Sequence, residues 1–143
     1  MKLNITEEFI EKSLILAENS PRKRVVKILH EDNYKMQMLI NCVLNGSIII
    51  PHKHEKPDKT EVFHILRGSI KLQEFNKDGK IIKSEILEEG DIGFTPPRTY
   101  HNLEVISDYA LLFICINGKY NPKTHHQELK SWKNINATIV EKN

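Results

Sequence analysis

Residues 46–68 read GSIIIPHKHEKPDKTEVFHILRG, and residues 90–101 read GDIGFTPPRTYH. Both segments alternate short apolar runs with glycine and proline, which is typical of β-strands joined by tight turns. His52 and His54 stand two residues apart after an apolar run, so on an extended strand both imidazoles point to the same face. The two segments therefore predict β-structure that carries a pair of histidines on one face.

The same pattern continues on both sides, and eight apolar runs follow one another between residues 36 and 116. Turn dipeptides such as Asn45-Gly46 and Asp78-Gly79 separate them. Eight short strands at this spacing predict a mainly β sandwich or barrel, and a double-sheet jelly roll is the natural match in size. The predicted strands cover residues 36–44, 47–50, 61–66, 69–75, 81–87, 91–95, 101–105 and 109–116.

A short helix is expected before the β-region. Thr6 can cap it, Glu7 and Glu8 occupy its first turn, and apolar residues recur on one face as far as Asn19. The chain should therefore begin with a helix and an arm that precede the barrel.

A polar tail is expected after the β-region. Leu129 and Trp132 are its apolar anchors, whereas the adjacent His125 and His126 are expected to diverge into solvent. We therefore predict one domain in three parts. These are a helix and arm over 1–35, a β-barrel over 36–118, and a tail over 119–143 that packs on the barrel and frays over 137–143.

Composition excludes several classes of protein. The 143 residues fit one domain, and 21 Lys and Arg against 19 Asp and Glu leave a net charge of only +2, so no nucleic-acid partner is expected. The longest apolar run, 110–116, is far shorter than the roughly 20 residues of a membrane span, and the first residues lack the apolar core of a secretory signal. We therefore expect a cytoplasmic protein with no membrane partner and with Cys42 and Cys115 reduced.

Two further residues can join the histidine pair. Glu61 opens the strand after the loop 55–60, so a chain reversal can bring its carboxylate back, and a closed barrel can project His101 into the same interior. The alternative is an HxH pair at the surface with no metal. Three imidazoles and one carboxylate suit Fe, Ni, Cu, Zn or Mn and leave two positions of an octahedral ion open. The predicted ligands of one divalent transition-metal ion are His52, His54, Glu61 and His101.

The spacing of these residues resembles the paired motifs of the cupin superfamily. The matching positions are Gly46, His52, His54, Glu61, Gly68, Gly90, Pro96 and His101. The resemblance implies a double-stranded β-helix in which the three histidines and the glutamate bind one metal ion. The sequence departs from the motif at Arg98, where a glycine is usual, and at Val105, where an asparagine is expected.

Nearly the entire chain is also similar to the WbuC family of cupin-fold metalloproteins. The similarity is carried by Ser20-Pro21-Arg22-Lys23-Arg24, His30, the PHKH of residues 51–54, the Glu61 strand, the PPRTYH of residues 96–101 and Tyr120-Asn121-Pro122. Members of that family are small bacterial proteins associated with lipopolysaccharide O-antigen gene clusters. The resemblance implies a cytoplasmic role near nucleotide-sugar or glycan assembly.

Strand parity predicts which neighbours share the face of the ligands. Phe63 lies two residues after Glu61 and should face the pocket as a substrate contact, whereas His64 should point away. Ile48 and Ile50 share the parity of the histidine pair and should form an apolar wall beside the metal.

Charged residues supply the other predicted contacts with an anionic or sugar-like ligand. Arg98 either holds a phosphate or carboxylate through its bidentate fork or forms a surface salt bridge. Arg22 and Arg24 belong to a basic triplet that is either a solvated face or an anion-binding arm. Tyr100, beside the third histidine, is the candidate catalytic base.

The predicted function is a metal-dependent enzyme that isomerises or epimerises a small oxygen-rich metabolite, such as a sugar or nucleotide sugar, by Lewis-acid catalysis. Two alternatives stay open. A mononuclear iron dioxygenase would use the same ligand set, and a non-catalytic module would bind its ligand for sensing. The sheet edges and the N-terminal arm predict a homodimer.

Overall fold

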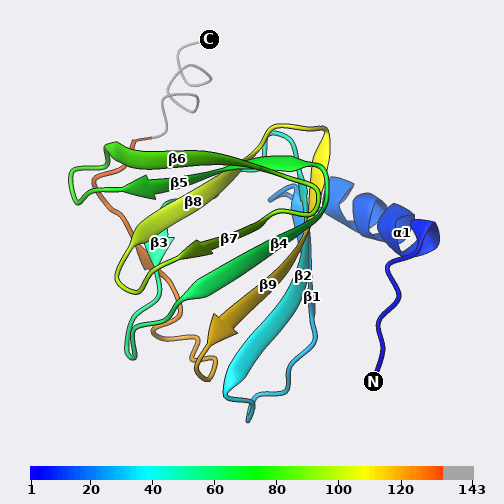
Figure 1. The fold of residues 1–143 in the computed structure, drawn as a ribbon, viewed down its shortest axis with the longest axis horizontal. Helices are drawn as coiled ribbons and strands as arrows, with labels where there is room; N and C mark the ends of the chain where they lie inside the picture. The colour runs from blue at the N-terminus through cyan, green and yellow to red at the C-terminus, as the bar shows by residue number, and fades with distance from the viewer. Residues whose placement is uncertain (134–143) are drawn as a thin grey trace.

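Two antiparallel sheets of five strands each form the body of the computed structural model, which describes residues 1–133 (Figure 1). The first sheet has the order β1-β2-β9-β4-β7, and the second has the order β10-β3-β8-β5-β6. The strands are β1 (Arg24–Ile28), β2 (Met36–Leu44), β3 (His52–Lys53), β4 (Glu61–Arg67), β5 (Ser69–Phe75), β6 (Ile81–Glu88), β7 (Ile92–Thr95), β8 (Tyr100–Val105), β9 (Tyr109–Asn117) and β10 (Gln127–Glu128). The predicted mainly β jelly roll with a short N-terminal helix is confirmed.

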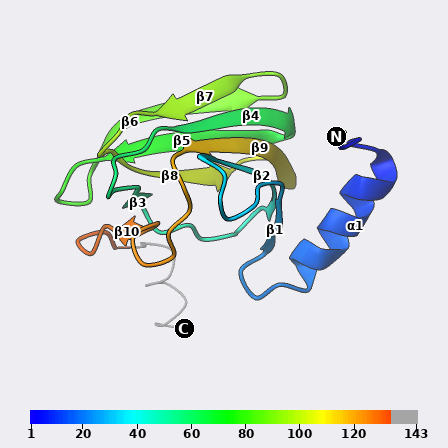
Figure 2. The same cartoon turned by 90° about the horizontal axis from the view of Figure 1, so that it is seen from below.

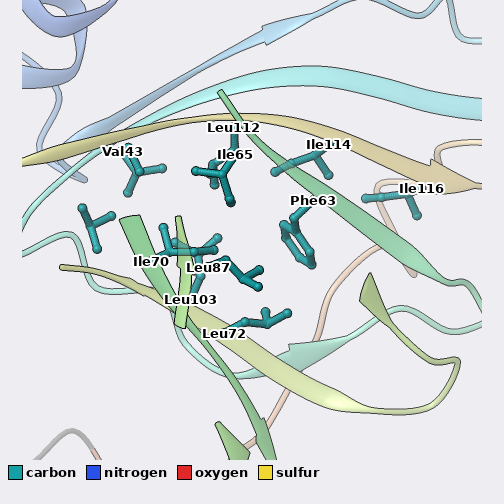
Figure 3. Packing of buried hydrophobic residues seen from close by; sticks show 12 residues of the cluster. Val43, Phe63, Ile65, Ile70, Leu72, Leu87, Leu103, Leu112, Ile114 and Ile116 are labelled. Carbon is teal, nitrogen blue, oxygen red and sulfur yellow. The ribbon is translucent and has the colours of Figure 1, made fainter. Parts of the chain in front are cut away.

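The core lies between the two sheets and is built from alternate strand residues. Phe63 and Ile65 of β4 and Leu112 of β9 meet Ile70 of β5 and Leu103 of β8 in one buried cluster (Figure 3). Alternation follows from the two-residue period of a strand, which sends every second side chain to the same face. Part of this cluster also forms the wall of the cavity described below.

The helix α1 (Glu7–Glu18) lies outside the first sheet, against β1 and β2 (Figure 2). Thr6 caps it as predicted, because the Thr6 Oγ1 accepts a hydrogen bond of 3.1 Å from the Phe9 backbone N–H. Its buried residues Ile10 and Ala17 pack in a second apolar cluster. The partners on the sheet are Ile40, Cys42 and Leu111. Within residues 1–133, no helix is long and apolar enough to cross a membrane.

The predicted strand over residues 47–50 is wrong. This segment is irregular, and the arm residues Arg24–Ile28 instead form β1, which pairs with β2. Because an irregular segment does not keep the strand period, Ile48 and Ile50 are 54% and 41% exposed. Ile49 packs against the core in their place, so the predicted apolar wall is displaced by one residue.

The described part of the tail returns to the barrel. β10 pairs with β3, and the backbone N–H of Leu129 donates a 2.8 Å hydrogen bond to the carbonyl of Pro51. Leu129 is buried and Trp132 is half-buried, so Leu129 is the deeper of the two predicted anchors. The fraying predicted for 137–143 lies outside the described residues.

We expect Gly68→Ala to lower the free energy of unfolding at least about twice as much as Gly90→Ala. Both glycines have positive φ, +76° and +93°, so each substitution costs about 1–2 kcal/mol in backbone strain. A methyl group at Gly68 would also strike the Tyr109 carbonyl and approach within 2.6 Å of the Ser107 Oγ, whereas Gly90 faces open space. Urea denaturation, followed by circular dichroism, measures the free energy of unfolding of each variant. Equal losses of stability in the two variants would contradict the tight turn between β4 and β5.

Candidate metal centre

The four predicted ligands converge inside the barrel from three strands. His52 of β3 is the direct cross-strand partner of His101 of β8, Glu61 is the first residue of β4, and His54 follows β3. All four are buried, with exposed fractions between 3% and 8%. Their potential ligand atoms lie within 4.8 Å of one another. Residues separated by up to 49 positions in the chain therefore form one group.

One oxygen of Glu61 lies at the centre of this group. Its Oε2 is 2.8 Å from the Nε2 of His54 and 2.8 Å from the Nε2 of His101, and it accepts a hydrogen bond from each ring. Such charge-assisted bonds to a buried carboxylate are strong and fix the positions of both partners.

The other nitrogen of each imidazole is held by the backbone. Every Nδ1–H donates to a carbonyl oxygen, which fixes the orientation of the ring and directs its Nε2 into the group. The acceptors are the carbonyls of Ile50 for His52 (2.9 Å), His125 for His54 (2.6 Å) and Thr99 for His101 (2.9 Å).

The pKa values of the buried residues in this group are shifted in different directions. Burial opposes ionisation of Glu61, but hydrogen bonds from His101 and His54 and the charges of those rings hold the pKa of Glu61 well below its ordinary value. Burial also disfavours the charged form of His101, yet the hydrogen bond and charge of Glu61 raise the pKa of His101. For His52, burial and then the charges of His101 and His126 hold the pKa well below its ordinary value.

The donor set fits a transition-metal ion. An ionised carboxylate and three imidazoles with backbone-anchored Nδ1–H groups are the ligands that Fe, Ni, Cu, Zn and Mn accept in proteins. A buried carboxylate that keeps its charge also favours a cation beside it. The residues His52, His54, Glu61 and His101 could therefore hold a metal ion.

A cavity of about 360 Å³ opens beside the group. Its apolar wall includes Phe63, Leu103 and Ile114, and Arg22 and Arg24 also line it. The structure therefore places three of the predicted substrate contacts, Phe63 and the two arginines, around the same space as the four predicted ligands.

Arg24 is fixed in its place at the cavity. Its Nη1 donates hydrogen bonds to the Ser47 Oγ (3.0 Å) and to the Ile48 carbonyl (2.9 Å). Burial, and then the positive charge of Arg22, lower the pKa of Arg24. An anion between the two guanidinium groups would offset the repulsion that Arg24 experiences from Arg22.

Arg98 and Tyr100 lie elsewhere. The Arg98 Nε is 3.6 Å from the Asp58 Oδ2, and its side chain is 74% exposed, so Arg98 forms a surface ion pair, one of its two predicted roles. Its φ of +62° lies in the left-handed region that favours glycine, the residue that is usual at this position of the cupin motif. The Lys53 Nζ lies 4.8 Å from the centre of the Tyr100 ring. The catalytic role of Tyr100 stays a prediction.

The expectation that the His125 and His126 side chains diverge is wrong, although His126 is exposed and His125 is half-buried. Their rings stack with centroids 4.6 Å apart, and the His126 ring lies 4.2 Å from that of His52. Burial first, and neighbouring histidines next, lower the pKa of His125 to about 3 and that of His126 to about 4. The antiparallel pairing of β10 with β3 brings the pair there, and such long-range pairing leaves no local signal in the tail sequence.

Two buried amides were also missed. Asn41 of β2 and Asn102 of β8 line the cavity, and the Oδ1 of each has no hydrogen-bond partner among residues 1–133. The Asn102 amide nitrogen donates to the Ile49 carbonyl at 3.1 Å. Each amide is a polar residue within an otherwise apolar strand segment, and a polar interruption of this kind is the signal that could have identified both.

A family model described as Domain of unknown function (DUF6016) matches residues 5–87. The chain belongs to this family. A search of curated proteins found no match. Similar solved structures include KdgF from Halomonas sp., at 17% identity and a TM-score of 0.57 over 73% of this chain and 86% of that one.

Two further structures extend the likeness. An oxalate oxidase in complex with the substrate analogue glycolate has 17% identity and a TM-score of 0.59 over 71% of this chain. The Cnp3 cupin domain of Schizosaccharomyces pombe has 14% identity and a TM-score of 0.55, covering 68% of this chain and 66% of that one. This chain spans about half the length of the oxalate oxidase, since 54% of that protein is covered. At these identities the likeness establishes the cupin fold.

We expect His52→Ala and His101→Ala each to lower the affinity for a divalent metal at least about tenfold, because each removes one donor from a preformed set. His64→Ala is the matched control, since His64 lies on β4 with its side chain away from Glu61. Untagged protein purified without added metal would be examined by elemental analysis and then titrated. Unchanged metal content in both ligand variants would contradict the site.

Proposed function

We propose that this cupin binds one divalent transition-metal ion through His52, His54, Glu61 and His101 and acts on a small sugar or nucleotide sugar. The observation that carries the proposal is the Glu61 carboxylate, buried between two imidazole Nε2 atoms at 2.8 Å and open to a cavity of about 360 Å³. A divalent cation held by these residues would supply Lewis-acid polarisation of a ligand oxygen, which promotes isomerisation or epimerisation.

The residues around the cavity support an anionic, hydroxyl-bearing ligand. Arg22 and Arg24 would bind a phosphate or carboxylate group, since guanidinium groups form paired hydrogen bonds with such anions. The free Oδ1 acceptors of Asn41 and Asn102 would receive hydrogen bonds from sugar hydroxyls. Phe63 and its apolar neighbours would exclude water from the reacting atoms.

The similarity to the WbuC family supports a place for this activity in lipopolysaccharide O-antigen synthesis. The same similarity implies a cytoplasmic role near nucleotide-sugar or glycan assembly, and we propose that location for the protein. The tail motif Tyr120-Asn121-Pro122 contributes to that similarity, and Tyr120 lines the cavity.

A panel of nucleotide sugars, incubated with metal-loaded protein, tests the proposed reaction. A change of sugar configuration, detected by nuclear magnetic resonance, is expected for at least one member. Protection against thermal unfolding without turnover across the panel would favour the non-catalytic binding module. Oxygen uptake by protein loaded with ferrous iron would favour the dioxygenase.

We expect Arg24→Gln to weaken binding of the selected nucleotide sugar at least about tenfold, because a hydrogen bond to a charged group contributes about 1.5–3 kcal/mol. Arg22→Gln should act in the same direction and leaves the bonds of Arg24 to residues 47 and 48 in place. Arg67→Gln is the control, since Arg67 lies at the far end of β4 beside Glu89. Calorimetry gives the dissociation constants, and equal values for all three variants would exclude the anion-binding arm.

We also propose a homodimer that uses the outer face of β4 and β7. Val62 and Phe94 are cross-strand partners on that face. Ile92 precedes Phe94 by two residues on β7 and therefore points to the same face. Their exposed fractions are 36%, 64% and 64%, and grouped apolar exposure of this kind is typical of subunit contacts.

Phe94→Glu is therefore expected to yield a monomer in light scattering coupled to size-exclusion chromatography, because a carboxylate cannot be buried unpaired in the contact. Ile15→Glu, on the exposed side of α1, should leave the molar mass unchanged. A monomeric unmodified protein would rule out the dimer.

A further inference from the structure

A second cavity, of about 610 Å³, lies between the turn at residues 21–24 and the segment 46–50. We call it the outer pocket. Arg22, Arg24 and His52 line both this pocket and the cavity at the metal centre, so the two spaces adjoin. The volume of the outer pocket is typical of small-molecule sites. A ligand with two parts can therefore extend from one space into the other.

One part of the lining of the outer pocket is strongly basic, because Arg22, Lys23 and Arg24 all belong to it. None of these three side chains pairs with a carboxylate among residues 1–133. Among the lining residues that the structure describes, Glu128 is the one acidic side chain. Three cations against one carboxylate give the pocket a positive potential, which attracts an anion with more than one negative charge.

Another part of the lining is apolar and includes Pro21, Ile48 and Ile50. The two isoleucine side chains are 54% and 41% exposed, so they leave apolar surface in contact with water in the free protein. A ligand that carries an apolar or aromatic face would remove this surface from water, and its burial would contribute to the binding free energy. The outer pocket therefore suits a ligand that is anionic at one end and apolar at the other.

Hydrogen bonds hold the basic turn against the apolar segment. The Arg24 Nη1 donates to the Ser47 Oγ at 3.0 Å and to the Ile48 carbonyl at 2.9 Å. The Ser47 Oγ in turn donates to the Arg22 carbonyl at 2.7 Å. The two parts of the lining are thus fixed relative to each other before a ligand arrives, and such preorganisation lowers the entropic cost of binding.

We propose that the outer pocket binds a nucleoside diphosphate, with the diphosphate on the basic turn and the base against Ile48 and Ile50. Guanidinium groups form paired hydrogen bonds with phosphate oxygens, and an ammonium group adds a further charged donor. The orientation rests on the proposed function, because it places the sugar of the same ligand in the first cavity, beside Glu61. The base and the diphosphate bind without any contact to the metal ion.

Metal-free protein tests the outer pocket separately from the proposed reaction. Untagged protein in chelator would be titrated by calorimetry with uridine, cytidine, guanosine and adenosine diphosphates and with inorganic pyrophosphate. At least one nucleoside diphosphate should bind about tenfold more tightly than pyrophosphate, because only the nucleoside covers the apolar part of the pocket. The proposal is overturned if none of them binds more tightly than pyrophosphate.

Variants of the two parts of the lining should separate their contributions. Lys23→Gln should weaken the binding of both the nucleoside diphosphate and pyrophosphate about tenfold, because it removes a charged donor. Ile48→Ser should weaken the binding of the nucleoside diphosphate about fivefold and leave that of pyrophosphate unchanged. The matched controls are Lys27→Gln on β1 and Ile82→Ser on β6, since neither residue lines the pocket.

Circular dichroism confirms that each variant is folded, so a weaker affinity reports on the pocket. If Lys23→Gln changes neither affinity, or if Ile48→Ser weakens both ligands equally, the proposal is overturned. Turnover of nucleotide sugars by metal-loaded protein is a separate measurement. Its failure, with the metal-free titrations as expected, would refute the proposed reaction and leave the outer pocket supported.

Discussion

The buried carboxylate of Glu61 is the constraint on which the site depends. A carboxylate with 6% exposure is stable only when cations or donors surround it, and His54 and His101 supply those contacts. Each of these rings must then point inward, and the backbone carbonyls at Thr99 and His125 hold them there. The loops before β8 and before β10 therefore supply the two carbonyls that keep His101 and His54 directed at the Glu61 carboxylate.

Much of the fold and the central ligand set followed from local patterns. Turn dipeptides that end in glycine separated the apolar runs, and the two-residue spacing of His52 and His54 placed both imidazoles on one side, so these features were visible within short windows. The motif spacing then predicted that Glu61 and His101 join them, which the geometry supports. Positions fixed by the strand period or by a tight turn were predictable for this reason.

The remaining features depend on contacts between distant segments. Ile49 replaced Ile48 and Ile50 because the segment is held by Arg24 rather than by a strand ladder, so its parity could not be inferred. His125 and His126 came to the site only because β10 pairs with β3. The buried acceptor of Asn41 became apparent only when the opposite wall of the cavity was known.

Residues 55–60 separate His54 from Glu61 in the chain, yet the two side chains meet at 2.8 Å. The strands on either side set the positions of the two side chains, because β4 is registered against β7 and β9, and β3 against β8 and β10. The end of the spacer is also fixed, since the Lys59 backbone N–H donates to the His54 carbonyl at 3.3 Å and the Thr60 N–H donates to the Asn117 side-chain oxygen at 2.6 Å. The exposed residues 56–58 are consequently the part of this connection where a grafted peptide would disturb the inorganic centre least.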